Sequence, residues 1–412
     1  MSIKLLKQAL NGKQALKPMW REQPLKDRYD VVIIGGGVHG LAAAYYLARH
    51  HGITDVAVLD KRYIGGGGSG RNTTIIRSNY LTPEGILFYD ESVKLYEQMS
   101  EEFDFNVMFS QRGHLTLAHT DASLRTMRWR AEVNQLQGVD SRVIYPDEIK
   151  RLAPHIDISD HPRYPVMGAL YHPPGGVIRH DAVVWGYARG ADERGVHIHQ
   201  MTEVTGIEVE ANRVTAVQTN RGRIATGVVL NATAGWASLI AAMAGVKLPI
   251  ETRPLQAAVS EPLKPFLDVV IVSGTLHFYL SQSARGEIVM GASVDPFTSY
   301  SMDSTLGFVE GLAGHVLELF PSLAKVRLMR QWAGLCDMTP DYSPIMGFTP
   351  VEGFLVDVGW GTYGFKAGPV SGKRMAELIA TQRTPELIAP FSYDRFFDGR
   401  LVGEKGAASV GH

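Results

Sequence analysis

The sequence predicts an α/β fold in which a doubly wound, Rossmann-like domain holds a dinucleotide and an inserted α+β domain carries an antiparallel or mixed sheet. Two observations lead to this prediction. A buried strand at 31–34 runs through Gly35-x-Gly37-x-x-Gly40 into a helix of small residues, as in dinucleotide-binding βαβ units. Several short β-like runs bounded by Pro and Gly fill 253–293, which is typical of a separate, smaller sheet.

Each glycine of the fingerprint has its own physical role. Gly35 permits a tight turn, Gly37 lets backbone N–H groups approach a pyrophosphate, and Gly40 lets the helix pack close to the strand. The N-terminus of that helix favours the negative phosphates. A second strand, 55–59, ends in Asp60, whose carboxylate can accept hydrogen bonds from the adenosine ribose. The motif in this context predicts a dinucleotide and leaves both NAD and FAD open.

Hydrophobic periodicity and turn residues predict the remaining elements. The expected helices are 41–49, 84–103, 122–138, 146–152, 181–194, 304–319 and 369–380. The further expected strands are 111–118, 196–200, 206–210, 213–219, 223–231, 255–259, 269–272, 276–280, 288–290 and 354–358. Asp181 is the expected N-cap of its helix, and Pro369 is expected in the first turn of the last one. Four glycines at 65–68 indicate backbone close to a ligand, or a mobile loop.

Composition excludes several classes of function. A net charge of −1 over 412 residues gives no electrostatic case for nucleic acid or an anionic membrane, and no apolar run reaches the length of a membrane span. The single cysteine, Cys336, can form neither a disulfide framework nor a cysteine zinc site. We therefore expect no metal, no membrane, and a cytoplasmic location. The stretch 1–27 is an extension that is either packed loosely on the surface or docks another subunit, and we weigh the two equally.

Five motifs accompany the fingerprint. They are Thr73-Thr-Ile-Ile-Arg77, Phe109-Ser-Gln-Arg-Gly-His-Leu-Thr-Leu, Asn231-Ala-Thr-Ala-Gly235-Trp, Thr339-Pro-Asp-Tyr-Ser-Pro344 and Gly361-Thr-Tyr-Gly-Phe-Lys366. Across about 28–395, this set resembles the flavin-dependent amine oxidases of the D-amino acid oxidase and sarcosine oxidase superfamily. Within it, the set is most similar to the β subunits of heterotetrameric sarcosine oxidases. The resemblance implies FAD, in a domain of the glutathione-reductase type, rather than a free nicotinamide cofactor.

The resemblance also implies which residues bind FAD. They are Gly35, Gly36, Gly37, His39, Gly40, Asp60, Lys61, Ser69, Arg71, Asn72, Thr73, Val204, Ala234, Gly235, Trp236, Gly361, Tyr363, Gly364, Phe365 and Lys366. The monomeric relatives attach FAD to a cysteine, but Gly334 stands at that place here, so FAD is expected to be non-covalent. The position of their oxygen-activating lysine falls near Val289, which puts direct oxygen reduction at FAD in doubt.

Three cationic or titratable residues are the candidates for chemistry. From composition alone, Arg77 and Lys366 would be ordinary solvated or ion-paired cations. By resemblance both are catalytic and contact the substrate carboxylate. The planar guanidinium of Arg suits this role, because it can form two parallel hydrogen bonds with a carboxylate. A lone loop histidine is usually polar surface, but the resemblance makes His172 the site of a covalent FMN, because a neutral imidazole nitrogen is nucleophilic. His180 is a nearby candidate that we rank lower.

The resemblance implies a complete reaction. FAD accepts a hydride from the N-methyl carbon of sarcosine, and electrons pass to FMN and then to O2, giving H2O2. The other products are glycine and formaldehyde, or methylenetetrahydrofolate. The implied partners are α, γ and δ subunits, with NAD only on a partner subunit. The alternatives are a related subunit acting on proline, an opine or glycine, a nicotinamide dehydrogenase, and a non-catalytic flavin carrier.

The expected domain boundaries follow the order of these elements. The FAD domain is predicted to be discontinuous and to comprise 28–110, 165–245 and 328–400. The substrate domain is predicted at 111–164 and 246–327, and 401–412 is a C-terminal tail.

Overall fold

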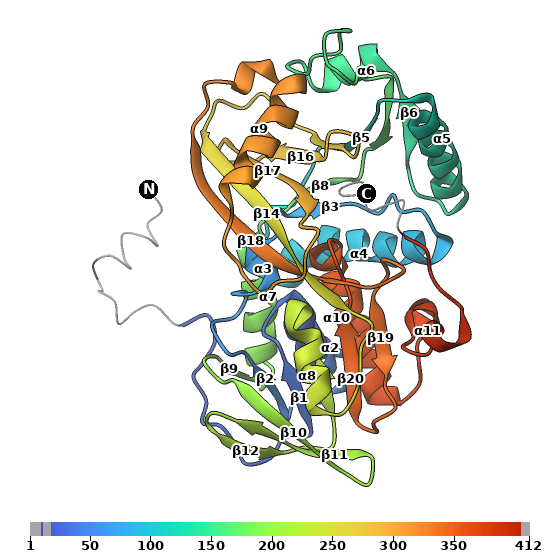
Figure 1. Cartoon of the computed structure of the whole chain (residues 1–412). Coiled ribbons are helices and arrows are strands. Elements are labelled where there is room, and N and C mark those ends of the chain that lie inside the picture. The colour runs from blue at the N-terminus through green and yellow to red at the C-terminus, as the bar shows by residue number, and fades with distance from the viewer. Residues whose placement is uncertain (1–9, 11–17, 405–412) are drawn as a thin grey trace.

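The fingerprint strand lies in the middle of a six-stranded sheet. In the computed structural model, which describes residue 10 and residues 18–404, β1 (Val31–Ile34) pairs with β2 (Val56–Leu59) and β13 (Val229–Asn231). The full order is β19-β20-β13-β1-β2-β9, which adds β9 (His197–His199), β20 (Phe354–Val358) and β19 (Ile345–Phe348). All neighbours are parallel except β19 and β20. The predicted doubly wound architecture is therefore confirmed (Figure 1).

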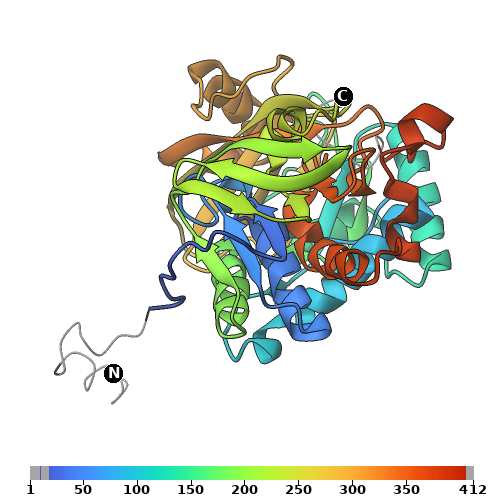
Figure 2. The ribbon, with the colours of Figure 1, turned by 90° about the horizontal axis from the view of Figure 1, so that it is seen from below.

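Different layers cover the two faces of this sheet. Val31 and Ile33 pack toward a core shared with α2 (Val38–His51), α4 (Pro83–Glu102), α7 (His180–Asp192) and α10 (Gly364–Thr381). Val32 and Ile34 point to the other face, as alternation along a strand requires. There they meet α8 (Ala237–Met243) and an antiparallel meander, β10 (Val204–Glu210), β11 (Arg213–Thr219) and β12 (Gly222–Ala225). Figure 2 shows this meander lying over the blue central strands.

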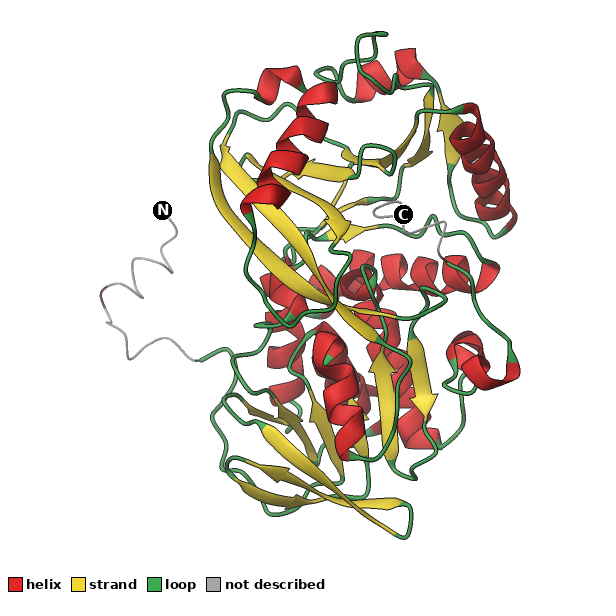
Figure 3. Cartoon of the chain, viewed as in Figure 1, coloured by secondary structure: helices red, strands yellow, loops and turns green. Residues whose placement is uncertain are grey.

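The second sheet has eight strands in the order β18-β14-β17-β16-β15-β5-β7-β6. Its strands are β5 (His114–Ala118), β6 (Arg142–Ile144), β7 (Gly168–His172), β14 (Glu251–Pro262), β15 (Val270–Ser273), β16 (Phe278–Gln282), β17 (Glu287–Val294) and β18 (Leu328–Met338). It is mixed, because only β15 and β5 run parallel. Helices α6 (Pro146–Leu152) and α9 (Leu306–Leu319) cover its outer face, and α5 (Asp121–Leu136) packs on its β5–β7 end (Figure 3).

Short elements complete the chain. A small sheet joins β3 (Ile75–Ile76), β8 (Gly176–Val177) and β4 (Ser110–Gln111). The remaining helical turns are α3 (Gly68–Arg71), η2 (Ala234–Trp236), η3 (Pro321–Leu323), η4 (Glu386–Phe391) and α11 (Arg395–Asp398). No helix among the described residues is both long and apolar enough to cross a bilayer.

Two predicted helix starts are wrong. The helix expected to be capped by Asp181 begins at His180, and Asp181 instead pairs with Arg179 at 2.6 Å. The last long helix, α10, begins at Gly364 and not at Pro369. Pro369 has no N–H for the carbonyl of Phe365, and the Tyr96 hydroxyl donates to that carbonyl at 2.5 Å. This tertiary contact explains how α10 tolerates an internal proline.

The predicted domain boundaries stay a prediction, but two segments bear on them. β7 and β18 fall within ranges that we assigned to the FAD domain, and both are hydrogen-bonded into the eight-stranded sheet. Most of the predicted N-terminal extension, 1–9 and 11–17, lies outside the described residues, as do 405–412 of the tail.

Candidate functional site

One pocket lies between the two sheets, where β1 and β2 end. Leu59 and Ala232 contribute to it from the first sheet, and Leu255, Val272 and Tyr279 from the second. The predicted residues that line it are Gly35, Gly37, His39, Asp60, Lys61, Ser69, Arg71, Asn72, Thr73, Arg77, Val204, Ala234, Trp236, Gly361, Tyr363, Gly364, Phe365 and Lys366. The others, Gly36, Gly40, Gly235 and His172, are not among the residues that line it.

The glycine turn at one end of the pocket has no room for side chains. Gly35 has a φ of +113°, and a Cβ there would collide with the carbonyl of Ala232. A Cβ on Gly40 would collide with the carbonyl of Gly35, where α2 crosses the turn. The backbone therefore comes as close to a ligand as glycine allows, and the N-terminus of α2 begins beside it at Val38.

Asp60 is fixed by the turn that it follows. Its Oδ2 accepts the N–H of Gly36 at 2.9 Å, and its Oδ1 accepts the N–H of Arg62 at 2.8 Å. Each oxygen keeps a lone pair for a further donor, such as a ribose hydroxyl. Next to it, the Lys61 ammonium lies 4.2 Å from the ring centroid of Trp236. Asp60, Lys61 and Trp236 therefore line the same end of the pocket.

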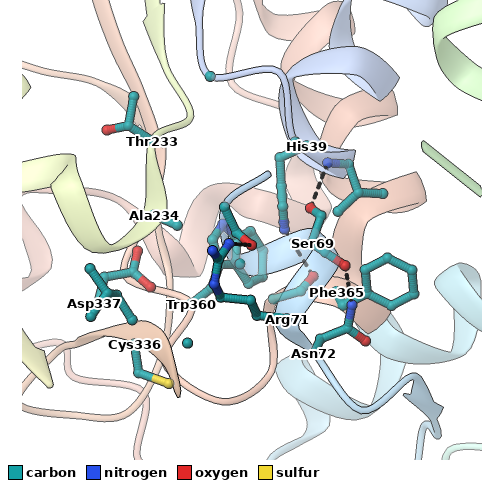
Figure 4. Close-up of a pocket in the computed structure, with 18 of the residues that line it drawn as sticks. His39, Ser69, Arg71, Asn72, Thr233, Ala234, Cys336, Asp337, Trp360 and Phe365 are labelled. Carbon is teal, nitrogen blue, oxygen red and sulfur yellow. Dashed lines mark hydrogen bonds between the residues drawn. The ribbon is translucent and has the colours of Figure 1, made fainter. Parts of the chain in front are cut away.

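The glycine run is an ordered turn that approaches the middle of the pocket. The guanidinium of Arg71 donates to the carbonyls of Gly66 and Gly67. The Ser69 hydroxyl accepts the N–H of Val38 at 2.9 Å and so ties the run to the start of α2. Figure 4 shows Ser69, Arg71 and Asn72 on one side of the pocket and Ala234, Cys336 and Asp337 on the other. Of the two expectations for this run, backbone close to a ligand is the one that this geometry favours.

Two buried cations lie at the other end. Arg77 is only 7% exposed; its guanidinium sits 4.5 Å from the ring centroid of Tyr80 and donates to Asn79 Oδ1 at 3.0 Å. Lys366, in the first turn of α10, donates to the carbonyl of Thr362 at 3.4 Å. Burial, assisted by the charge of Arg77, lowers the pKa of Lys366 to about 7. An anionic group bound between them would relieve this repulsion.

Neither Asp337 nor Cys336 is set up for covalent chemistry. Burial raises the pKa of Asp337 to about 6, and its carboxylate accepts the N–H of Gly359 at 2.6 Å, which fixes the loop before α10. Burial also raises the pKa of the Cys336 thiol, so the nucleophilic thiolate is disfavoured. Gly334 lies next to Arg71, because a Cβ built on this glycine would be 3.5 Å from the Cβ of Arg71. No group of His, Cys, Asp and Glu among the described residues could hold a metal ion.

His172 lies at the end of β7 and is fully buried. Its Nδ1 lies 2.7 Å from the carbonyl oxygen of Asp140, which only an N–H can satisfy. Its Nε2 accepts the N–H of Ser78 at 3.2 Å. Burial lowers the pKa of His172 to about 4, so the ring is neutral with its lone pair on Nε2. His180, the lower-ranked candidate, is the first residue of α7.

The sequence reasoning missed several residues of the pocket wall. His114, Glu203, Tyr279, Asp337 and Trp360 all line it. Trp360 and His114 stand within or beside motifs quoted above, and that proximity was the one signal available. Tyr279 lies on a predicted strand, in which side chains point alternately to the two faces of the sheet. That alternation indicates which residues share a face with Tyr279, but not that this face lines a pocket.

Comparison with known proteins places this site in context. A family profile described as FAD dependent oxidoreductase matches residues 30–378. The chain is similar to the sarcosine oxidase subunit beta of Rhodobacter capsulatus, at 46% identity over 98% of each chain. It is also similar to the subunit of the same name from Arthrobacter sp, at 47% identity over 96% of this chain and 97% of the relative. Among solved structures it resembles the L-proline dehydrogenase from P. horikoshii, with a TM-score of 0.86 and 32% identity over 92% of this chain and 100% of the other.

Proposed function

The chain belongs to the FAD dependent oxidoreductases and, within them, to the sarcosine oxidase β subunits, and on this premise we propose that it is the sarcosine-oxidising flavoprotein subunit of a multi-subunit enzyme. The observation that carries the proposal is the presence of two buried cations, Arg77 and Lys366, on the wall of a dinucleotide pocket. A buried pair of cations suits the carboxylate of an amino acid.

The pocket fits non-covalent FAD. The glycine turn leaves space for a pyrophosphate at the start of α2, and both Asp60 oxygens keep lone pairs for a ribose. Most of the predicted FAD residues, including Gly35 and Lys366, line the same pocket. Cys336, the one cysteine of the chain, is held as a thiol by burial, which supports a cofactor without a covalent bond to sulfur.

The chain's own residues then have defined tasks. When bound, FAD supplies the acceptor for the hydride that leaves the N-methyl carbon of sarcosine. Arg77 and Lys366 hold the carboxylate and so orient the methyl group toward it. Their positive charge disfavours a protonated amine in the same pocket, so the substrate binds with a neutral nitrogen whose lone pair forms the C=N bond. The iminium ion that results, which keeps the N–H of the amine, reacts with water to give glycine and formaldehyde, or its methylene carbon passes to tetrahydrofolate.

A spectroscopic titration tests this function. Sarcosine added without oxygen is expected to bleach the FAD absorption band of the purified protein. A protein that carries oxidised FAD but is not bleached by sarcosine, or by any amino acid in a substrate panel, would be a flavin carrier. A protein without a flavin band would contradict the proposal altogether.

Proline is the second candidate substrate, because the solved relative described above is an L-proline dehydrogenase. Proline and sarcosine share a carboxylate and a secondary amine, so Arg77 and Lys366 would serve both. Comparing kcat/KM for sarcosine, proline, an opine and glycine, with FAD reduction as the readout, decides between them.

We further propose that His172 carries a covalent FMN, from which electrons pass to O2 to give H2O2. The proposal rests on the family resemblance and is supported by the neutral ring, whose Nε2 lone pair is the nucleophile needed. A bond at Nε2 would replace its contact with the N–H of Ser78. Mass analysis of denatured protein is expected to find an FMN-sized adduct on the peptide with His172; an unmodified peptide in the assembled enzyme rules it out.

The partners that we propose follow the names of the relatives. Both relatives described above are called subunit beta, and we propose α, γ and δ subunits as partners, with NAD bound only on a partner. Co-purification from the native source, followed by separation of the chains, tests the set. The single, buried cysteine supports a cytoplasmic location for the assembly.

A further inference from the structure

His114 is buried in the pocket wall without a hydrogen-bond partner. It is 1% exposed, and neither Nδ1 nor Nε2 has a partner within the described residues. Leaving a buried donor or acceptor unpaired costs free energy, so such groups call for a ligand or a water. The other fully buried histidines of the described chain, His119, His172 and His199, each have at least one partner. His114 is therefore the exception that needs an explanation.

The strand that carries His114 aims it at the pocket. Leu115 and Leu117 of β5 pack into the core beneath α9, so His114 and Thr116 point to the opposite face. His114 lies beside Val270 of β15 and His172 of β7 in the sheet. Several other buried polar atoms in the described residues lack partners, including the Thr116 hydroxyl, but only those of His114 belong to a residue of the pocket wall.

The charges around His114 fix its state. Burial, together with the cations Arg77, Arg130 and Lys366, holds the pKa of His114 well below its usual range. The ring is neutral and, whichever nitrogen carries the proton, it offers one lone pair. It is therefore an acceptor at the end of the pocket where Arg77 and Lys366 provide only donors.

We propose that His114 accepts a hydrogen bond from the amine N–H of the substrate and thereby makes the site selective for secondary over tertiary amines. This inference rests on the function proposed above. The neutral amine of N-methylglycine has one N–H, which His114 can accept. The neutral amine of N,N-dimethylglycine has none, so that substrate leaves the lone pair of His114 unpaired. A site built to bind an N–H rejects an analogue that lacks it.

The test compares the two substrates by their rates of FAD reduction. The ratio of kcat/KM for sarcosine over dimethylglycine is expected to fall about tenfold in His114→Leu, which corresponds to the loss of one good hydrogen bond. His114→Gln keeps an acceptor oxygen and is expected to retain most of the ratio. The matched control is Thr116→Val, which removes another partnerless buried group from the same strand face outside the pocket and should leave the ratio unchanged.

Several outcomes would overturn the inference. An unchanged ratio in His114→Leu would contradict the inference: with equal losses for both substrates His114 is a structural residue, and with no loss for either it does not contribute to the reaction. If His114→Leu does not retain FAD, the FAD-loaded His114→Gln variant is measured instead. If the ratio of kcat/KM for sarcosine over dimethylglycine falls in His114→Gln as well, His114 does not act as a hydrogen-bond acceptor. If wild-type protein reduces its FAD with proline and not with sarcosine, the proposed substrate fails, and the same ratio is measured with proline and N-methylproline.

Discussion

Arg77 differs from a surface arginine in being almost fully buried and held in place. The ring of Tyr80 and the side chain of Asn79 fix its guanidinium from one side, and the pocket lies on the other. A guanidinium held at a pocket wall in this way forms charge-assisted, bidentate hydrogen bonds with a carboxylate. Its fixed position therefore suits an anionic group of the substrate.

Replacing Arg77 by Ala should reveal this role. We expect kcat/KM for sarcosine to fall about 100-fold, since charge-assisted hydrogen bonds to a carboxylate are lost. A secondary amine without a carboxylate should lose far less. The measurement is FAD reduction with both substrates. Arg112→Ala, which removes an exposed arginine paired with Asp268, serves as the control, and equal losses for both substrates in Arg77→Ala would argue against a carboxylate clamp.

Lys366 gives the site a pH dependence whose sign can be worked out. Its pKa is lowered to about 7 by burial and by Arg77, so its ammonium is present below pH 7 and lost above it. Since a carboxylate binds the ammonium form, affinity should be greatest below the pKa of Lys366 and weaken above it, by up to about tenfold per pH unit. Acetate is the suitable ligand, because it has no amine of its own to titrate.

The binding of acetate, followed by the perturbation of the flavin spectrum between pH 7 and 9, measures this effect. Lys366→Arg should flatten the dependence, because a guanidinium stays charged throughout. The pKa of His172, about 4, and that of Asp337, about 6, both lie below this window. A pH dependence that survives unchanged in Lys366→Arg would assign it to another group.

At the scale of elements, the entry into α10 shows how a contact distant in sequence decides a local structure. Local rules place Pro369 in a first turn, yet the helix starts five residues earlier and brings Lys366 into its first turn. The Tyr96 hydroxyl from α4 makes this possible by donating to the carbonyl of Phe365. No local pattern could have predicted a partner so far along the chain.

Removing that hydroxyl should destabilise the protein. Tyr96→Phe is expected to lower the free energy of unfolding by about 1–3 kcal/mol, because the carbonyl of Phe365 is left buried and unpaired. Pro369→Ala in the same chain restores an N–H and should recover part of this loss, so the two changes should couple in a double-mutant cycle. Urea unfolding measures both. Tyr187→Phe, whose hydroxyl makes only a 3.5 Å contact, is the control; simple additivity would contradict the explanation.

The sequence predicted elements and motifs better than their contacts. Strands β1, β2 and β20 and the helix expected at 41–49 were predicted, because fully apolar runs and glycine spacing are local signals. Strands β7 and β18 were not predicted, and neither were their sheet partners, because strand pairing depends on residues far away in the chain. The same limit applies to the site: Arg77 and Lys366 stand in motifs, whereas the exceptional feature of His114 is the absence of a partner in three dimensions.

At the scale of the whole molecule, the pocket lies between the two sheets and is lined by residues from both. The long strands β14 and β18 pair with each other along the edge of the second sheet, and η2, which follows β13, packs against both. The pocket wall combines Gly35 and Asp60 from the first sheet with Val272 and Tyr279 from the second. A ligand in this pocket contacts both halves at once, so FAD should stabilise the entire chain and not only its own domain.

Removing FAD should therefore lower global stability. Binding to the native state alone contributes about 2.7 kcal/mol when free FAD is at 100 times its Kd. For a chain of 412 residues this corresponds to a fall in Tm of roughly 3 °C in the FAD-free protein. Thermal unfolding with increasing FAD should restore the Tm in a concentration-dependent way. AMP, which lacks the flavin half expected to lie toward the second sheet, should restore much less. Equal recovery with AMP, or an unchanged Tm without FAD, would contradict a dinucleotide that spans both sheets.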